Sequence, residues 1–208
     1  MAVIDVHTHM MCREWLQLLA DHGAPKYRLG KTPAGQDSIF MWDAPFVTLF
    51  DEMFDFERRI VNMDKAGVDL AIVSLTCPSA SFGDEQISAK AARLMNKAMA
   101  EQQSLHPDRL RWFATLPWQF SDAAVSELHL AVKEGAVGVF VSANIDEMSL
   151  TAPAFAPVWQ AIDNLGIPVL VHPTAPQGTK QMALDEYGLV PPIGFMFDTT
   201  LAIARMIF

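Results

Sequence analysis

Short apolar segments alternate with amphipathic segments along most of this chain, and this alternation limits the possible folds more than any other feature. Continuous apolar runs are typical of parallel strands that are buried on both faces. Since parallel strands are joined by crossover helices, the pattern predicts right-handed β/α units. The five expected strands begin at Val3, Val68, Leu110, Val137 and Pro168. The expected helices span residues 13–21, 55–66, 84–105, 122–134, 154–165 and 197–208.

The number of units and the chain length together indicate an incomplete barrel. A (β/α)8 TIM barrel has eight units and a typical length of ~250 residues, whereas this chain has 208 residues. We therefore expect an α/β fold with about the first five β/α units of a TIM barrel, in a single domain over residues 1–208. Residues 23–54 are expected to form an inserted loop, because much of this segment is rich in glycine, proline and polar residues without periodicity. An open barrel leaves strand edges unpaired, which favours oligomerisation.

The first expected strand carries the motif Asp-Val-His-Thr-His at residues 5–9. Alternate side chains of a strand share a face, so His7 and His9 point the same way. Two imidazoles fixed on one strand can bind one transition metal ion, such as zinc. Two surface histidines on an edge strand are the alternative interpretation, but the apolar neighbours Val3, Ile4 and Val6 favour the metal site.

A third histidine ends the fifth expected strand. Residues 167–173 read Ile-Pro-Val-Leu-Val-His-Pro, so His172 closes an apolar run and Pro173 stops the strand. In barrels of this type the functional groups lie at the carboxyl ends of the strands. We therefore expect His7, His9 and His172 to converge on zinc or another divalent transition metal. For His172 alone, a core histidine with a backbone partner is the alternative.

Composition and charge exclude several classes of partner. The net charge of −9 argues against nucleic acid and against an anionic membrane surface, because both attract basic patches. The two cysteines, Cys12 and Cys77, provide no disulfide framework, which fits a reducing compartment. The first residues lack the pattern of a signal peptide, and no apolar run approaches the ~18 residues of a membrane span. We expect a cytoplasmic protein.

Four residues are candidates for contact with a substrate. Trp42 and Phe50 belong to an aromatic-rich segment that is consistent with a pocket wall, although such clusters more often pack in a core or an interface. Trp118 and Asn144 follow the third and fourth expected strands, at the mouth of the expected barrel. For Trp118 a packing role is equally compatible with the sequence.

Two neighbouring arginines, Arg58 and Arg59, lie in the second expected helix. A guanidinium group can bind a carboxylate through two hydrogen bonds, so either residue is a possible substrate anchor. The nearby acidic residues Asp51, Glu52 and Asp55 favour salt bridges instead.

The motifs together resemble the amidohydrolase superfamily, and within it the amidohydrolase-2 group of proteins similar to aminocarboxymuconate-semialdehyde decarboxylase. The matching segments are residues 5–9, 59–68, 114–117, 135–139, 171–173 and 199–204. This resemblance implies a mononuclear metal, usually zinc, bound by His7, His9, His172 and an aspartate on strand eight. It also implies a catalytic histidine on strand six, and members of the group are often dimers, so we expect a homodimer.

The resemblance implies a metal-dependent decarboxylase of an unsaturated or aromatic carboxylic acid. The alternatives are a metal-dependent hydrolase of a carbon–carbon, lactone or amide bond, and a truncated, non-catalytic metal-binding fragment. The residues implied on strands six and eight would lie beyond Phe208, so no catalytic residue is assigned, and a chain of this length is expected to be inactive alone. Phe50 stands where the semialdehyde decarboxylases carry an arginine for a substrate carboxylate, which argues against that particular substrate.

Overall fold

The computed structural model describes residues 1–184 and 186–208, and its main sheet has five parallel strands. The order in the sheet, β1-β5-β6-β7-β10, follows the order in the chain, as expected for successive β/α units. The strands are β1 (Ile4–His9), β5 (Leu70–Ser74), β6 (Leu110–Ala114), β7 (Gly138–Ser142) and β10 (Val169–His172). The prediction of an α/β fold with five parallel β/α units is therefore confirmed.

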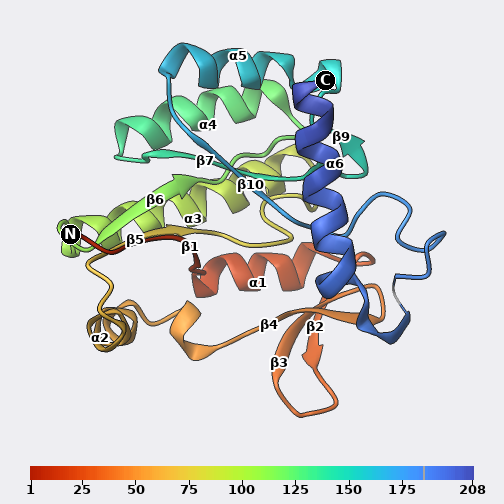
Figure 1. Cartoon of the computed structure of the whole chain (residues 1–208), viewed down its shortest axis with the longest axis horizontal. Helices are drawn as coiled ribbons and strands as arrows, with labels where there is room; N and C mark the ends of the chain where they lie inside the picture. Colours follow the sequence, from red (N-terminus) through yellow and green to blue (C-terminus); the bar gives the residue numbers. More distant parts are fainter. Residues whose placement is uncertain (185) are drawn as a thin grey trace.

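In the described ranges, six α-helices connect or follow these strands: α1 (Arg13–His22), α2 (Phe56–Ala66), α3 (Glu85–Leu105), α4 (Ser121–Lys133), α5 (Ala156–Leu165) and α6 (Phe195–Ile207). Contacts join α1 to α3, α3 to α4 and α4 to α5, so these helices form a row beside the sheet (Figure 1). Short helical turns lie at η1 (Asp51–Met53), η2 (Pro153–Phe155), η3 (Glu186–Gly188) and η4 (Val190–Gly194). No helix in the described part of the chain is long and apolar enough to cross a membrane.

The segment between α1 and α2 differs from the expected irregular loop. It contains a three-stranded antiparallel sheet of β2 (Tyr27–Lys31), β3 (Asp37–Met41) and β4 (Ala44–Thr48), which Figure 1 shows apart from the main sheet. Ile39 and its neighbours on β3 are buried, and α1 packs against β2. These strands are short and interrupted by glycine and proline, so their stability comes from pairing and from burial, which a local pattern does not show. A second small sheet pairs β8 (Asn144–Ile145) with β9 (Met148–Ser149).

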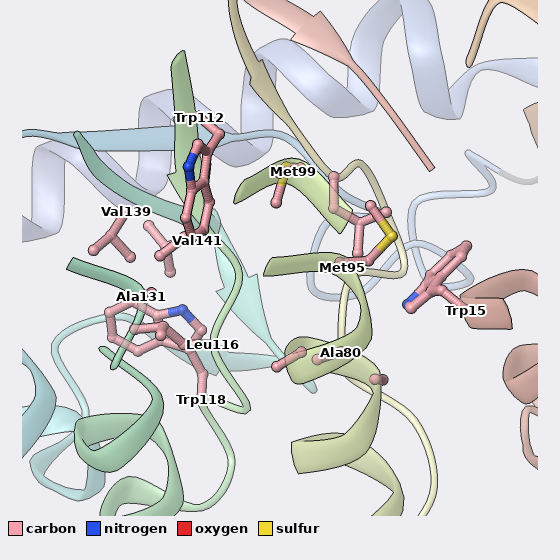
Figure 2. Close-up of a cluster of buried hydrophobic side chains, with 14 of the residues drawn as sticks. Trp15, Ala80, Met95, Met99, Trp112, Leu116, Trp118, Ala131, Val139 and Val141 are labelled. Carbon is pink, nitrogen blue, oxygen red and sulfur yellow. The ribbon is translucent and has the colours of Figure 1, made fainter. Parts of the chain in front are cut away.

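The hydrophobic core lies between the sheet and the row of helices. Figure 2 shows side chains from several elements meeting there, among them Trp15 of α1, Met95 of α3 and Trp112 of β6, all fully buried. By contrast, Ile4 and Val6 of β1 are 53% and 54% exposed. Strands β1 and β10 are the two edges of the sheet within the described residues, which agrees with the expected open barrel.

Candidate metal centre

The three histidines predicted as metal ligands lie together at the carboxyl ends of β1 and β10. One ring nitrogen from each of His7, His9 and His172 lies within 4.8 Å of the other two. The ring centroids of each pair are 4.8 to 5.0 Å apart. The Nε2 atoms of His9 and His172 are 3.2 Å apart. Two nitrogens that bind one ion at ~2.1 Å lie roughly 3.0–3.4 Å apart at tetrahedral or octahedral angles, so the spacing fits shared ligands.

This contact shows how strongly the main sheet curls. Strands β1 and β10 are at opposite edges with three strands between them. In a flat sheet two such strands would be roughly 19 Å apart, at ~4.8 Å per strand. Because His9 on β1 touches His172 on β10, the sheet bends into the arc of a barrel wall. The curl therefore brings together histidines that are 163 residues apart.

Hydrogen bonds aim the Nε2 atom of His172 at the centre of this group. Its Nδ1 atom lies 2.7 Å from the carbonyl oxygen of Pro173, and a carbonyl only accepts hydrogen bonds. Nδ1 therefore carries the proton and donates, and Nε2 keeps its lone pair. On His9, the Ser74 hydroxyl lies 3.3 Å from Nδ1, so the other nitrogen, Nε2, again points toward the centre. When Nδ1 of His9 donates to the Ser74 hydroxyl, the Nε2 lone pairs of His9 and His172 face each other, an arrangement that a shared cation stabilises.

The surroundings of His9 and His172 keep these two rings neutral. Burial is the main cause that lowers the pKa of His9 to about 3, and the neighbouring His172 and His7 lower it further. Burial also lowers the pKa of His172 to about 4. Neutral imidazole is the form that binds metals, so protons do not compete at these two residues near neutral pH. The donor set, its spacing and its protonation thus all fit a divalent transition metal.

Strand β1 departs from the even alternation that the sequence motif suggested. Its register against β5 shifts between Asp5 and Thr8, where β1 contains one residue more than its partner. The backbone amide of His7 donates instead to the side chain of Asp5, at 3.1 Å. A bulge of this kind re-aims side chains, and here both histidines still reach the same centre.

The two arginines of α2 have different partners. Arg58 forms the expected salt bridge, with its Nη2 atom 2.8 Å from Glu52. Arg59 instead donates to β1, to the Thr8 hydroxyl at 2.5 Å and to the His9 carbonyl at 2.6 Å. The expectation of a salt bridge is therefore correct for Arg58 and wrong for Arg59, because α2 leads into β5, the neighbour of β1 in the sheet, and Arg59 reaches β1 from there.

The four candidate substrate residues do not all lie together. Trp42 and Asn144 line one pocket, together with Ser142, which pairs with His172 in the sheet. Phe50 is half exposed and lines a different hollow, between α1 and the antiparallel sheet. Trp118 is buried, and its indole nitrogen donates to the Phe140 carbonyl at 3.3 Å, which supports the packing alternative. Contact of these residues with a substrate stays a prediction.

Asp198 is a residue of this region whose role the sequence pattern did not show. The helix expected over residues 197–208 would place Asp198 next to its beginning, but α6 begins at Phe195 and Asp198 lies inside its first turn. Its carboxylate is buried and accepts hydrogen bonds from the side chain of Asn144 and from the backbone amide of Thr174, both at 3.0 Å. Asp198 thus ties α6 to the segment that follows His172.

Comparisons with known proteins find relatives that share this sequence pattern and fold. The 2-amino-3-carboxymuconate-6-semialdehyde decarboxylase of Dictyostelium discoideum is 28% identical over 210 aligned residues, covering 99% of this chain and 57% of that protein. The crystal structure of 5-carboxyvanillate decarboxylase from Sphingomonas paucimobilis superimposes with a TM-score of 0.84 at 23% identity, covering 99% of this chain and 62% of the other. A dihydroxybenzoic acid decarboxylase from Polaromonas sp. JS666, solved with manganese and the inhibitor 2-nitroresorcinol, has a TM-score of 0.72 at 25% identity, with 97% and 58% of the two chains covered.

The chain thus spans less than two thirds of the length of these relatives. Within this chain, that length contains the curled sheet and the three histidines at its carboxyl edge. The family pattern named Amidohydro_2, described as amidohydrolase, matches residues 4–205, almost the whole chain. This protein therefore belongs to the amidohydrolase family of that name.

Proposed function

We propose that this chain carries the metal-binding half of a metal-dependent decarboxylase that acts on small aromatic or unsaturated carboxylic acids. The convergence of His7, His9 and His172 carries the proposal, because three imidazoles at one point can bind one ion and leave room for further ligands. The relatives support the choice of reaction, since they are named as decarboxylases of a muconate semialdehyde and of a dihydroxybenzoic acid.

The residues of the site would bind and orient the reacting groups. A divalent metal would supply a Lewis acid that stabilises the negative charge developing as carbon dioxide leaves. The carbonyl of Pro173 holds the His172 ring in one tautomer, and Ser74 holds His9. These fixed rings need no reorganisation when a substrate carboxylate or phenolate approaches.

The pocket beside His172 is the proposed place for the substrate ring. Trp42 offers an aromatic face at its wall, and Tyr27 and Asn144 offer polar groups. The lining also includes charged residues such as Lys26, Asp146 and Glu147, and sites for small organic ligands combine an apolar wall with placed polar groups. The segment 23–54 that carries Trp42 and Tyr27 would then be the insertion that shapes this pocket.

Three finer properties belong to the same proposal. Zinc is the expected ion from the histidine ligands, and manganese is the competing choice because the Polaromonas relative binds it. A homodimer and a cytoplasmic location are also proposed. The exposed apolar residues of β1 support the dimer, and the two free cysteines support a reducing compartment.

The test begins with metal binding and then measures product formation. Purified protein, freed of metal and reloaded with Zn²⁺ or Mn²⁺, should bind about one ion per subunit, as three convergent histidines require. A panel of hydroxybenzoic and unsaturated acids is then assayed for release of carbon dioxide by the chain within a complete barrel, because residues 1–208 alone are expected to be inactive. Release of carbon dioxide, together with the product in which hydrogen replaces the carboxylate, supports the decarboxylase if His172→Asn releases none. Incorporation of water into the products would support the hydrolase instead. If the purified protein binds no metal, the proposed metal-dependent reaction is refuted.

A further inference from the structure

Arg59 makes an unusual set of contacts with the strand that carries two of the histidines. Its three side-chain nitrogens donate to three successive residues of the chain. Nη1 reaches the Thr8 hydroxyl at 2.5 Å, Nη2 reaches the His9 carbonyl at 2.6 Å, and Nε lies 2.5 Å from the Met10 sulfur. The guanidinium therefore forms hydrogen bonds with the end of β1, including the backbone of His9 itself.

Among the described residues no carboxylate lies within salt-bridge distance of Arg59, although the charges of Asp5 and Glu52 offset part of the effect of burial on its pKa. The salt bridges among the described residues pair Arg58, Arg93 and Arg109 with acidic groups, but none includes Arg59. A partly buried guanidinium without an ionic partner loses hydration that hydrogen bonds only partly replace. Burial accordingly lowers the pKa of Arg59 below its usual range. Stability alone is thus a weak reason for placing an arginine here.

Geometry offers a stronger reason. Because of the bulge between Asp5 and Thr8, the regular ladder with β5 does not hold the middle of β1. Directly after the bulge, Arg59 bonds to both the side chain of Thr8 and the backbone of His9. A planar guanidinium with a fixed fork of donors can set the position of such a segment, whereas a lysine has only one nitrogen.

We propose that Arg59 is a positioning residue that holds the end of β1 so that the imidazoles of His7 and His9 stay directed at one metal ion. This inference rests on the proposed metal binding of the site. Groups that orient metal ligands from behind typically change metal affinity 10–100-fold when they are removed. Arg59 acts on the metal only through β1, so its charge is not what matters.

The experiment measures metal affinity of the purified, metal-free protein by titration with Co²⁺ against a competing chelator. Arg59→Gln and Arg59→Lys should both weaken binding roughly 10–100-fold, and both should alter the visible absorption spectrum of the bound Co²⁺. Arg58→Gln is the matched control, since Arg58 is the neighbouring residue, pairs with Glu52 and has no hydrogen bond to β1 among the described residues. The control should stay within about twofold of the unmodified protein.

Two results would overturn the proposal. If Arg59→Gln keeps the affinity and the Co²⁺ spectrum of the unmodified protein, even with a lower melting temperature, Arg59 only stabilises the fold. If Arg59→Lys restores the affinity fully, charge and not the fork of donors is responsible. If Arg59→Gln does not fold, Thr8→Val provides the test, because it removes one acceptor of Arg59. Thr8→Val should weaken Co²⁺ binding, and unchanged binding would refute the positioning role of Arg59. Absence of binding by the unmodified protein would instead contradict the proposed function.

Discussion

Replacing Asn96 by alanine should destabilise the protein more than most single substitutions. Asn96 lies on α3, is fully buried, and mimics a peptide group toward Thr115 beyond the end of β6. Its Oδ1 atom accepts from the Thr115 amide and its Nδ2 atom donates to the Thr115 carbonyl, both at 2.8 Å. Nδ2 also donates to Glu127 of α4 at 2.7 Å. One side chain thus joins a strand end to two helices.

The magnitude follows from the groups that lose a partner. In Asn96→Ala the buried amide and carbonyl of Thr115 both become unsatisfied, and each such group costs about 1–3 kcal/mol. Glu127 keeps its salt bridge to Arg93, at 3.0 Å, so its loss is smaller. Alanine recovers roughly 0.5 kcal/mol through its helix propensity. We therefore expect the free energy of unfolding to fall by about 1.5–5.5 kcal/mol, a large part of the ~5–15 kcal/mol typical of a domain.

The assay is urea unfolding of the metal-free protein, followed by tryptophan fluorescence and by circular dichroism. The control is Lys97→Ala on the same helix, where the exposed side chain lies 3.7 Å from Glu101. Such a surface pair contributes roughly 0.2–1 kcal/mol at most, so the control should unfold almost as the unmodified protein does. A loss below ~1 kcal/mol for Asn96→Ala, with the slope against urea unchanged, would refute the reasoning.

Three further predictions concern the metal centre and its surroundings. The metal-free protein should lose stability as the pH falls from 6.5 toward 4, because the unfolded chain takes up protons at histidines whose folded pKa values are about 3 for His9 and about 4 for His172. The free energy of unfolding should change by up to ~1.4 kcal/mol per pH unit for each of the two histidines. Urea unfolding of His172→Asn should show a weaker dependence on pH, and an equal dependence would contradict the prediction. Asp198→Asn should lower the free energy of unfolding by about 1–3 kcal/mol, because Asn144 and Thr174 donate to different oxygens of Asp198 and an amide offers an oxygen to only one of them. If neither urea unfolding nor Mn²⁺ binding changes, Asp198 does not hold α6 to the segment after His172. Trp42→Ala should raise KM for an aromatic acid with little change in kcat. A lower kcat with unchanged KM would contradict the prediction that Trp42 contacts the substrate ring.

The parallel sheet was predictable because its signal is local. Each strand is a short apolar run and each helix has its own periodicity, so the observed β10 (Val169–His172) and α3 (Glu85–Leu105) lie within a residue or so of the predicted ranges. Helix ends were also marked locally, as at Gly67, whose φ of 68° closes α2 in the left-handed conformation that glycine adopts readily. The antiparallel sheet at residues 27–48 was missed, because its strands are defined by their partners.

The metal centre was only partly predictable for the same reason. His7, His9 and His172 follow from strand ends, since parallel β/α units bring their carboxyl ends to one edge of the sheet. The sequence gives no sign that Arg59 would bind β1, because a pair of arginines next to acidic residues is typical of a salt-bridged surface. Asn96 was likewise hidden, since nothing in the periodicity of α3 indicates a polar residue facing Thr115.

The sequence by itself determined the alternation of strands and helices, the family, and the three histidines at the strand ends. Only the tertiary structure decided that the sheet curls enough for His9 to meet His172, that β1 is bulged, and which polar groups hold it. Periodicity and strand ends depend on neighbouring residues and on backbone hydrogen bonds, which repeat regularly along the chain. Contacts across the fold depend on which side chains meet when distant elements pack, and no local pattern records that.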